Sequence, residues 1–260
     1  MLAPDAFAKA IAGDGWCLFP NVLDSETTAA LRSDSLKWVD ICREFQIRNG
    51  INADGDGTAH HSIGGDDSID AFIDSHLFHP YLDLFFGSAP YILHACNPVG
   101  GLPNRVNYVH NIHRDVRTYI PDYNMRMNVL VMLDDFTPEN GATHVLTGSH
   151  RQAEPPAPEA FDRDFQRLTG PAGSVVLFNS YLWHRGGLNI TDRARVALTL
   201  SYGPAYIKPQ LDYARMLGED YGEGLSKQTR QVLGYTSRVP TSLDEWYRPA
   251  ATRLYRSDQG

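Results

Sequence analysis

The chain has 260 residues, 42% hydrophobic and 21% charged, which is the composition of a folded globular protein rather than a disordered or fibrous one. Its 23 basic and 31 acidic residues give a net charge of −8 without any Lys/Arg run, which argues against nucleic acid or anionic lipid as a partner. No stretch approaches the roughly 20 apolar residues of a membrane span and the N-terminus lacks a signal-peptide pattern, so we expect a cytoplasmic protein with no membrane contact.

The first third of the chain is expected to be helical. A short helix is predicted over Pro4–Ile11, and a longer one over Glu26–Cys42 with Asp24 or Ser25 as its N-cap. Apolar residues recur at helical spacing again over Ile69–Phe86. These segments predict helices that precede the central part of the chain.

A loop is predicted between these helices, over Asn49–Asp67, because this stretch is rich in Gly and Asp and has no apolar periodicity. Its Asp54-Gly-Asp56-Gly-Thr58 segment is similar to the start of a calcium-binding loop. The twelfth position of such a loop should be a bidentate Glu, and here it is Gly65. We therefore expect no calcium site.

The middle of the chain is rich in β-branched and aromatic residues, broken by Gly, Pro and Asn. Seven strands are predicted: Tyr91–Ala95, Arg105–His113, Met125–Leu133, Thr143–Leu146, Ser174–Phe178, Leu182–Arg185 and Arg195–Tyr202. Seven short strands indicate a sandwich or jelly roll, mainly β with flanking helices. We expect one domain over 1–260, with N-terminal helices (1–90), a jelly-roll core (91–203) and a helical C-terminal extension (204–260).

The three cysteines, Cys17, Cys42 and Cys96, are an odd number without paired spacing. This pattern favours reduced thiols that are buried as small apolar residues over disulfides or a zinc site.

Two candidate metal ligands, His113 and Asp115, lie two residues apart, so on a β-strand both side chains would leave the same face. A second imidazole is available at His184, in a β-type run that ends in a Gly-Gly turn. Two His and one carboxylate on one face of an octahedron leave three positions open, enough for a chelating 2-oxo acid and dioxygen. A hydrolytic zinc site needs one open position.

A cation for the oxo acid is predicted on the strand that follows. Alternation places Arg195, Ala197, Thr199 and Ser201 on one strand face. A guanidinium fork matches the far carboxylate of a metal-bound 2-oxo diacid. We interpret Arg195 as this buried cation and Arg193, at the start of the strand, as a surface charge.

Four motifs in this order resemble the phytanoyl-CoA dioxygenase family of Fe(II)- and 2-oxoglutarate-dependent oxygenases. They are His113-Arg-Asp115, Asp135–His150 with its Asn-Gly-Ala-Thr and Gly-Ser-His pieces, Gly173–Phe178, and His184–Arg195. The resemblance runs from about Gly15 to Tyr202 and implies a double-stranded β-helix. It also implies Fe(II) held by His113, Asp115 and His184, 2-oxoglutarate held by Arg195, and O2 as the second cosubstrate.

Further positions follow from the same resemblance. Relatives contact the oxo acid through the residue three before the first ligand and through the Thr of the Asn-Gly-x-Thr segment, here His110 and Thr143. Relatives often carry Gln at the first of these positions. Asn128 is expected either to face the site or to be taken up by a hydrogen bond within the sheet. Ser149 and His150 are interpreted as turn residues.

The implied reaction is hydroxylation or desaturation of an unactivated C–H bond of a small-molecule metabolite, with release of succinate and CO2. Iron halogenases lack the carboxylate that Asp115 supplies, which favours these two outcomes. A metal-dependent hydrolase using the same His/Asp/His site is one alternative, but it leaves Arg195 without a role and has no evident general base. A non-catalytic jelly-roll binding protein is the other.

The substrate is expected to be set by the loops 49–67, 116–124 and 151–166. The absence of a basic patch for coenzyme A phosphates favours a small metabolite over an acyl-CoA. Arg117, Tyr119, Tyr123 and Arg126 are placed to meet an anionic or aromatic substrate, or else their arginines pair with acidic residues at the surface. Both readings stay open at this point, and no pattern indicates an oligomeric state.

Overall fold

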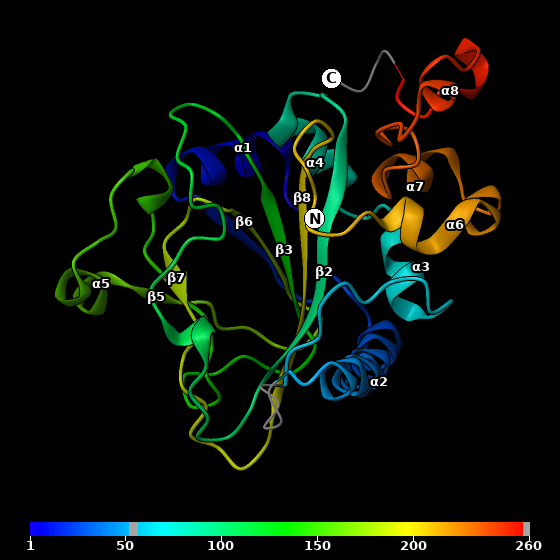
Figure 1. Cartoon of the computed structure of the whole chain (residues 1–260). Coiled ribbons are helices and arrows are strands. Elements are labelled where there is room, and N and C mark those ends of the chain that lie inside the picture. The colour runs from blue at the N-terminus through cyan, green and yellow to red at the C-terminus, as the bar shows by residue number, and fades with distance from the viewer. Residues whose placement is uncertain (52–56, 257–260) are drawn as a thin grey trace.

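Two antiparallel sheets form the centre of the molecule in a computed structural model that describes residues 1–51 and 57–256 (Figure 1). The larger sheet has the strand order β1-β6-β3-β8-β2, and the smaller has the order β5-β4-β7. The strands of the larger sheet are β1 (Trp16–Phe19), β2 (Tyr91–Gly101), β3 (Met127–Met132), β6 (Val175–Asn179) and β8 (Arg195–Pro204). The strands of the smaller sheet are β4 (His144–Val145), β5 (Gln166–Arg167) and β7 (His184–Arg185). This arrangement confirms the predicted mainly β core.

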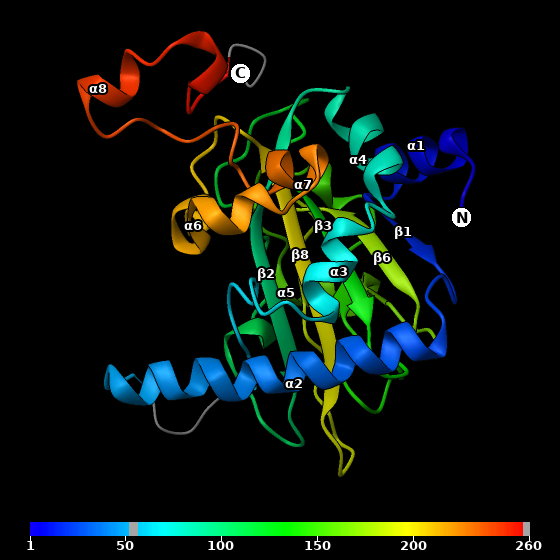
Figure 2. The ribbon, with the colours of Figure 1, turned by 90° about the vertical axis from the view of Figure 1, so that its right-hand side faces the viewer.

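Helices flank the sheets on the outside. In chain order they are α1 (Pro4–Gly13), α2 (Ser25–Arg48), α3 (Ser68–Asp74), α4 (His79–Phe86), α5 (Pro158–Asp164), α6 (Tyr213–Glu223), α7 (Lys227–Val232) and α8 (Leu243–Trp246). Figure 2 shows α2, α3 and α7 in front of the larger sheet, covering one of its faces. None of the described helices is both long and apolar enough to cross a membrane.

The central strand β3 shows why the core has two layers. Its side chains alternate, so Val129 and Val131 pack with the helices while Leu130 and Met132 pack in a second apolar cluster that includes Val145 of the smaller sheet. All six residues of β3 are buried. A strand with both faces buried reads as a continuous apolar run, which explains the Met-Asn-Val-Leu-Val-Met sequence.

The N-terminal helices depart from prediction in two places. α2 begins as expected with Asp24 as N-cap, whose side chain accepts a 2.7 Å hydrogen bond from the Thr27 amide, but it continues to Arg48. The helical spacing over Ile69–Phe86 corresponds to two helices, α3 and α4, that are separated by a turn. His76 has a φ of 53° there, which a right-handed helix does not accommodate.

One of the seven predicted strands is absent. Over Arg105–His113 the chain instead forms a 3-10 turn at Tyr108–His110, capped by Asn107, and His113 alone makes an isolated bridge, with His184. The other six predicted strands are present, although two of them are reduced to β4 and β7. β5 was not predicted, since an exposed Gln-Arg pair carries no strand signal.

All three cysteines are free, and Cys17 and Cys96 are buried in the core as predicted, whereas Cys42 is half-buried. Asp54 and Asp56 of the calcium-like segment lie outside the described residues.

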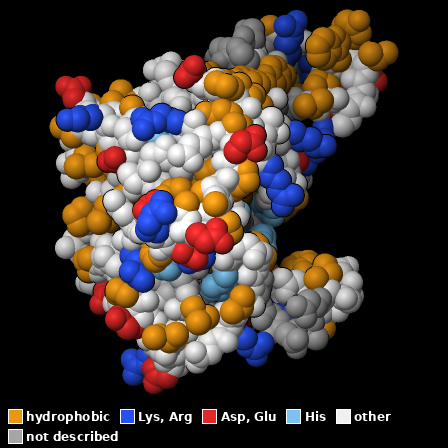
Figure 3. Space-filling model, turned by 90° about the vertical axis from the view of Figure 1, so that its left-hand side faces the viewer, with side chains coloured by type: hydrophobic (Ala, Val, Ile, Leu, Met, Phe, Trp, Pro, Cys, Tyr) orange, Lys and Arg blue, Asp and Glu red, His pale blue; other side chains and the backbone are white. Residues whose placement is uncertain are grey.

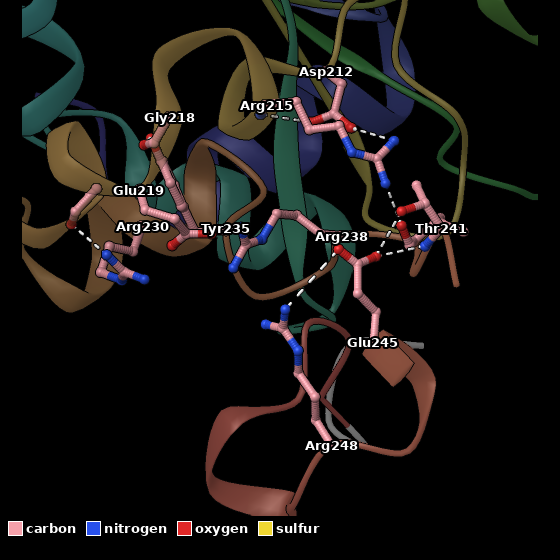
Figure 4. A network of polar contacts seen from close by, with 12 residues as sticks. Asp212, Arg215, Gly218, Glu219, Arg230, Tyr235, Arg238, Thr241, Glu245 and Arg248 are labelled. Atoms are coloured by element: carbon pink, nitrogen blue, oxygen red, sulfur yellow. Dashed lines mark hydrogen bonds and ion pairs between the residues drawn. The ribbon is translucent and has the colours of Figure 1, made fainter. Parts of the chain in front are cut away.

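The C-terminal part of the chain contains α6, α7 and α8 joined by irregular segments, and it is held by polar contacts (Figure 4). Asp212 caps α6 and pairs with Arg215, whose Nη1 lies 3.4 Å from its carboxylate. Farther along the chain, Arg238 forms an ion pair with Glu219, which ties the segment after α7 back to α6.

Candidate metal centre

Three candidate ligands converge at one end of the smaller sheet. The Asp115 Oδ1 atom lies 3.7 Å from Nε2 of His113 and 3.8 Å from Nε2 of His184. One ligand atom from each residue lies within 4.8 Å of the other two. Distances of this size leave room for a single ion between the three atoms.

The backbone brings these ligands together in a way that the sequence did not predict. His113 and Asp115 do not share a continuous strand; His113 is bridged to His184 by reciprocal amide–carbonyl bonds of 2.9 and 2.8 Å. The Asp115 amide then donates to the Ser180 carbonyl at 3.1 Å. Two anchor points therefore replace the regular strand and still turn both side chains toward β7.

Both imidazoles are oriented for metal binding through Nε2. The Nδ1 atom of His113 lies 2.8 Å from the Asn111 carbonyl, and that of His184 lies 2.9 Å from the Leu182 carbonyl. A carbonyl can only accept, so each Nδ1 carries the proton and each Nε2 keeps its lone pair. Burial also lowers the pKa of His184, which favours the neutral, ligating form. These carbonyls left no signal in the sequence, because they belong to the backbone.

The third ligand is fixed by Asn128 of β3. Its Nδ2 donates a 2.6 Å hydrogen bond to Oδ2 of Asp115, which leaves Oδ1 toward the two imidazoles. Of the two alternatives for Asn128, the structure shows the one in which the side chain faces the site.

The ligands line a cavity of about 240 Å³ that also contains Asn128, Thr143 and Arg195 in its wall. His110 is placed differently. Its Nδ1 lies 2.9 Å from Oδ1 of Asn107 as part of the cap of the 3-10 turn, and the cavity wall is formed there by its neighbour Val109. Histidine side chains are visible among dispersed acidic and basic side chains on the face shown in Figure 3.

Arg195 is a buried cation that lacks a carboxylate partner. It is 6% exposed, its guanidinium lies 4.2 Å above the Phe136 ring, and Nη2 donates to the Gly141 carbonyl at 3.0 Å. Its Nε has no hydrogen-bond partner, and no described carboxylate lies within 4.0 Å. Burial lowers the pKa of Arg195 to about 10, opposed by Asp134, so the side chain remains charged at neutral pH. A buried guanidinium without a carboxylate partner fits the carboxylate of a bound 2-oxo diacid.

Arg193, in contrast, is exposed at the start of the same strand. The predicted face of β8 is also found, since Arg195, Ala197, Thr199 and Ser201 all line the cavity. Sequence reasoning missed Tyr108, Val109 and Gln210 in the wall. They lie on irregular segments, where no periodicity indicates which way a side chain points.

A jelly roll that brings two histidines, a carboxylate and a buried arginine into one cavity has the architecture of the non-haem iron oxygenases that use a 2-oxo acid. In agreement with this, the model of the phytanoyl-CoA dioxygenase (PhyH) family matches residues 11–197, and the chain belongs to that family. Membership confirms the resemblance seen in the motifs and implies Fe(II), 2-oxoglutarate and O2 as the reactive components.

Individual relatives agree with this family. The uncharacterized protein Rv1501 of Mycobacterium tuberculosis is 37% identical over 148 residues, which cover 57% of this chain and 54% of that protein. This chain therefore spans about half the length of that relative. Dioxygenase cdmA of Talaromyces verruculosus is 23% identical over 262 residues, covering 91% of this chain and 85% of that one.

Among solved structures, EctD from S. alaskensis, crystallised with 2-oxoglutarate and 5-hydroxyectoine, superposes with a TM-score of 0.63 at 19% identity. The match covers 80% of this chain and 78% of EctD. It confirms the predicted fold, a double-stranded β-helix with flanking helices.

Proposed function

We propose that this chain is an Fe(II)- and 2-oxoglutarate-dependent dioxygenase that hydroxylates or desaturates an unactivated C–H bond of a small-molecule metabolite, releasing succinate and CO2. One observation carries the proposal: the His113/Asp115/His184 cluster shares a single cavity with the Arg195 guanidinium, which has no carboxylate partner among the described residues. A metal site alone would suit many reactions. A metal site with a buried cation in the same cavity suits a metal-bound oxo diacid.

Each residue has a distinct role in this proposal. His113, Asp115 and His184 would hold Fe(II), which together with 2-oxoglutarate and O2 supplies the oxidising power for C–H cleavage. Arg195 would bind the far carboxylate of 2-oxoglutarate and fix its orientation, with Thr143 beside it. Asn128 would hold Asp115 in its ligating orientation.

His110 stays a prediction as a contact to the oxo acid. Its Nδ1 is engaged by Asn107 in the cap of the 3-10 turn, so such a contact would have to come from Nε2.

The rest of the cavity positions the substrate rather than moving protons. Apolar side chains in its wall, among them Leu130, Phe178 and Ala197, exclude water from the reacting centre. The outcome is then decided by which C–H bond lies nearest the metal, which is a matter of orientation.

The hydrolase alternative is weaker on the same geometry. Among the described residues of the cavity wall, Asp115 is the sole carboxylate, and it is committed to the ligand cluster. A metal-activated water would therefore have no separate carboxylate base. That alternative also leaves the buried charge of Arg195 without a purpose.

The proposal is tested by incubating the protein in air with Fe(II), 2-oxoglutarate and ascorbate against a panel of metabolites. We expect one or more compounds to stimulate succinate formation and to appear in the mass spectrum with one added oxygen or two fewer hydrogens. A product formed at an equal rate without O2 and 2-oxoglutarate would contradict the proposal.

A further inference from the structure

A second arginine, Arg126, lines the same cavity, and its side chain forms no hydrogen bond or ion pair with the described residues. It directly precedes β3, and its backbone carbonyl accepts from the Ser180 amide, which fixes the start of the side chain beside the ligand cluster. Its Nε is shielded from solvent and has no hydrogen-bond partner. Such an atom costs free energy unless a ligand satisfies it.

The acidic residues of the region are committed elsewhere. Asp115 acts on Arg126 electrostatically but forms no ion pair with it, and its carboxylate is held by Asn128 and directed toward the two histidines. Asp134, which follows β3, pairs with Arg32 at 2.7 Å. Once a metal occupies Asp115, the positive charge of Arg126 has no counter-charge among the described residues.

The neighbouring arginines do not share this property. Arg114 lies over aromatic rings, 5.1 Å from that of Trp183, and donates to the Gln152 and Arg117 carbonyls. Arg117 itself is exposed. Of the candidates near the first ligands, Arg126 is therefore the one that faces the reaction cavity.

The two cavity arginines lie at different levels of the larger sheet. Arg195 pairs with Gly101 across β2 and β8. Arg126 lies against Gly203, where an added Cβ would be 3.2 Å from its Cγ. Gly203 is eight residues beyond Arg195 on β8, roughly 26 Å at the usual rise per residue. The Asn128–Ser201 pair, which marks the level of the Asp115 carboxylate, lies between them.

Ser201 adds a second unsatisfied group on this side. It is 9% exposed, lines the cavity, and its Oγ has no hydrogen-bond partner. Gln210, which follows β8, contributes an amide to the same wall. A guanidinium, a hydroxyl and an amide are the donors that an oxyanion needs.

We propose that the substrate carries an anionic group, a carboxylate or a phosphate. Arg126 is the specificity-determining residue that binds this group, and the Ser201 hydroxyl donates to it as well. This inference rests on the proposed function, in which 2-oxoglutarate engages the metal with one end and Arg195 with the other. Both carboxylates of the oxo acid are then satisfied, and Arg126 is left for the substrate. The reacting C–H bond lies within one small molecule's length of that anionic group.

The test uses small probes on protein saturated with Fe(II) and 2-oxoglutarate under nitrogen. Benzoate, phenylacetate and phenyl phosphate are compared with benzamide, phenylacetamide and phenol for their effect on the melting temperature. We expect the anions to raise the melting temperature of the wild type more than their neutral counterparts do. Whichever of the carboxylates and the phosphate gives the larger shift identifies the anionic group of the substrate. Equal shifts, or none, would overturn the inference.

Variants locate the effect. Arg126→Gln should weaken anion binding roughly 10- to 100-fold, the range of a charge-assisted hydrogen bond, while Arg126→Lys retains part of it. Arg193→Gln removes the same charge from the surface and should leave the anion preference intact. If the preference survives in Arg126→Gln, the assignment to Arg126 is wrong.

A separate titration distinguishes this inference from the proposed function. Binding of 2-oxoglutarate to the Fe(II) protein is followed by visible charge-transfer absorption without O2. We expect Arg126→Gln to bind the oxo acid within about threefold of the wild type. Loss of that binding would assign Arg126 to the oxo acid and overturn the inference alone. Failure of the wild type to bind it would contradict the proposed function.

Discussion

Asn128 holds Asp115 by one carboxylate oxygen, Oδ2, at 2.6 Å, and thereby directs the other, Oδ1, toward the two imidazoles. The carboxylate is therefore placed before any metal arrives. Asn128 lies on β3, the central and fully buried strand, so the position of Asp115 is tied to the middle of the larger sheet although Asp115 itself lies in a bend.

Replacing Asn128 with Ala should weaken metal binding without removing a ligand. Partners that orient metal ligands typically contribute about 10- to 100-fold in metal affinity, and we expect a loss in that range. Titration with Fe(II) or Co(II) measures it. Asn49→Ala, at the exposed end of α2, provides a matched control, and an affinity equal to that of the control would refute the role of Asn128.

Replacing Arg195 with Gln should impair 2-oxoglutarate binding while sparing the metal. The guanidinium would supply a charge-assisted, bidentate contact, so we expect the Kd for 2-oxoglutarate to rise about 100-fold. Isothermal titration under nitrogen measures this, and Fe(II) affinity should change less than about threefold. Arg193→Gln serves as the control. Unchanged oxo-acid affinity would place the far carboxylate elsewhere.

Gly141 should not tolerate a side chain. Its φ is +82°, and an added Cβ would lie 2.4 Å from the Gly187 carbonyl, while its own carbonyl accepts from Arg195. The backbone conformation alone costs a non-glycine residue about 1–3 kcal/mol, and the clash adds to this. Urea unfolding of Gly141→Ala should show a loss of at least that size. Gly13→Ala, where an added Cβ meets nothing within 4 Å, should change stability by less than about 1 kcal/mol; equal effects would contradict the account.

Stability should fall on mild acidification. Burial lowers the pKa of His79 and of His94 to about 4. Between about pH 6.5 and 4 the unfolded imidazoles take up protons that the folded ones do not, so the free energy of unfolding is full above this window and decreases as pH falls through it.

Urea unfolding at several pH values tests this. Each histidine contributes a slope of at most about 1.4 kcal/mol per pH unit, and His79→Gln should reduce the total slope. An identical pH dependence in the variant would show that His79 does not titrate as its burial indicates.

The parts of the fold that could be predicted from sequence are those with local signals. A run rich in β-branched and apolar residues identified β3, alternation identified the cavity face of β8, and a capping side chain identified the start of α2 at Asp24. The strand predicted over Arg105–His113 was wrong. Its apolar residues alternate as in a strand, but the Asn107 side chain caps a 3-10 turn, and this local hydrogen bonding competes with strand formation. The break between α3 and α4 depends on the left-handed backbone conformation of His76, which the residue type does not predict.

The site shows the same division. The spacing of His113 and Asp115 and the parity of β8 selected residues that the structure brings into one cavity, because both depend on residue type and period. The orientation of Asp115 could not be predicted, since it depends on a bridge between His113 and His184 that are 71 positions apart and on Asn128 from another strand. Long-range contacts of this kind leave no pattern in a single sequence.

Oxygen uptake with matched succinate release tests the central claim most directly. Fe(II)-loaded protein is given 2-oxoglutarate, ascorbate and a compound that stimulates succinate formation in air, alongside Asp115→Ala and the surface control Asp40→Ala. The account predicts one succinate per O2 in the wild type and in the control, and loss of both signals in Asp115→Ala. A wild type that consumes no O2 in response to 2-oxoglutarate, or an Asp115→Ala variant that still does, would contradict it.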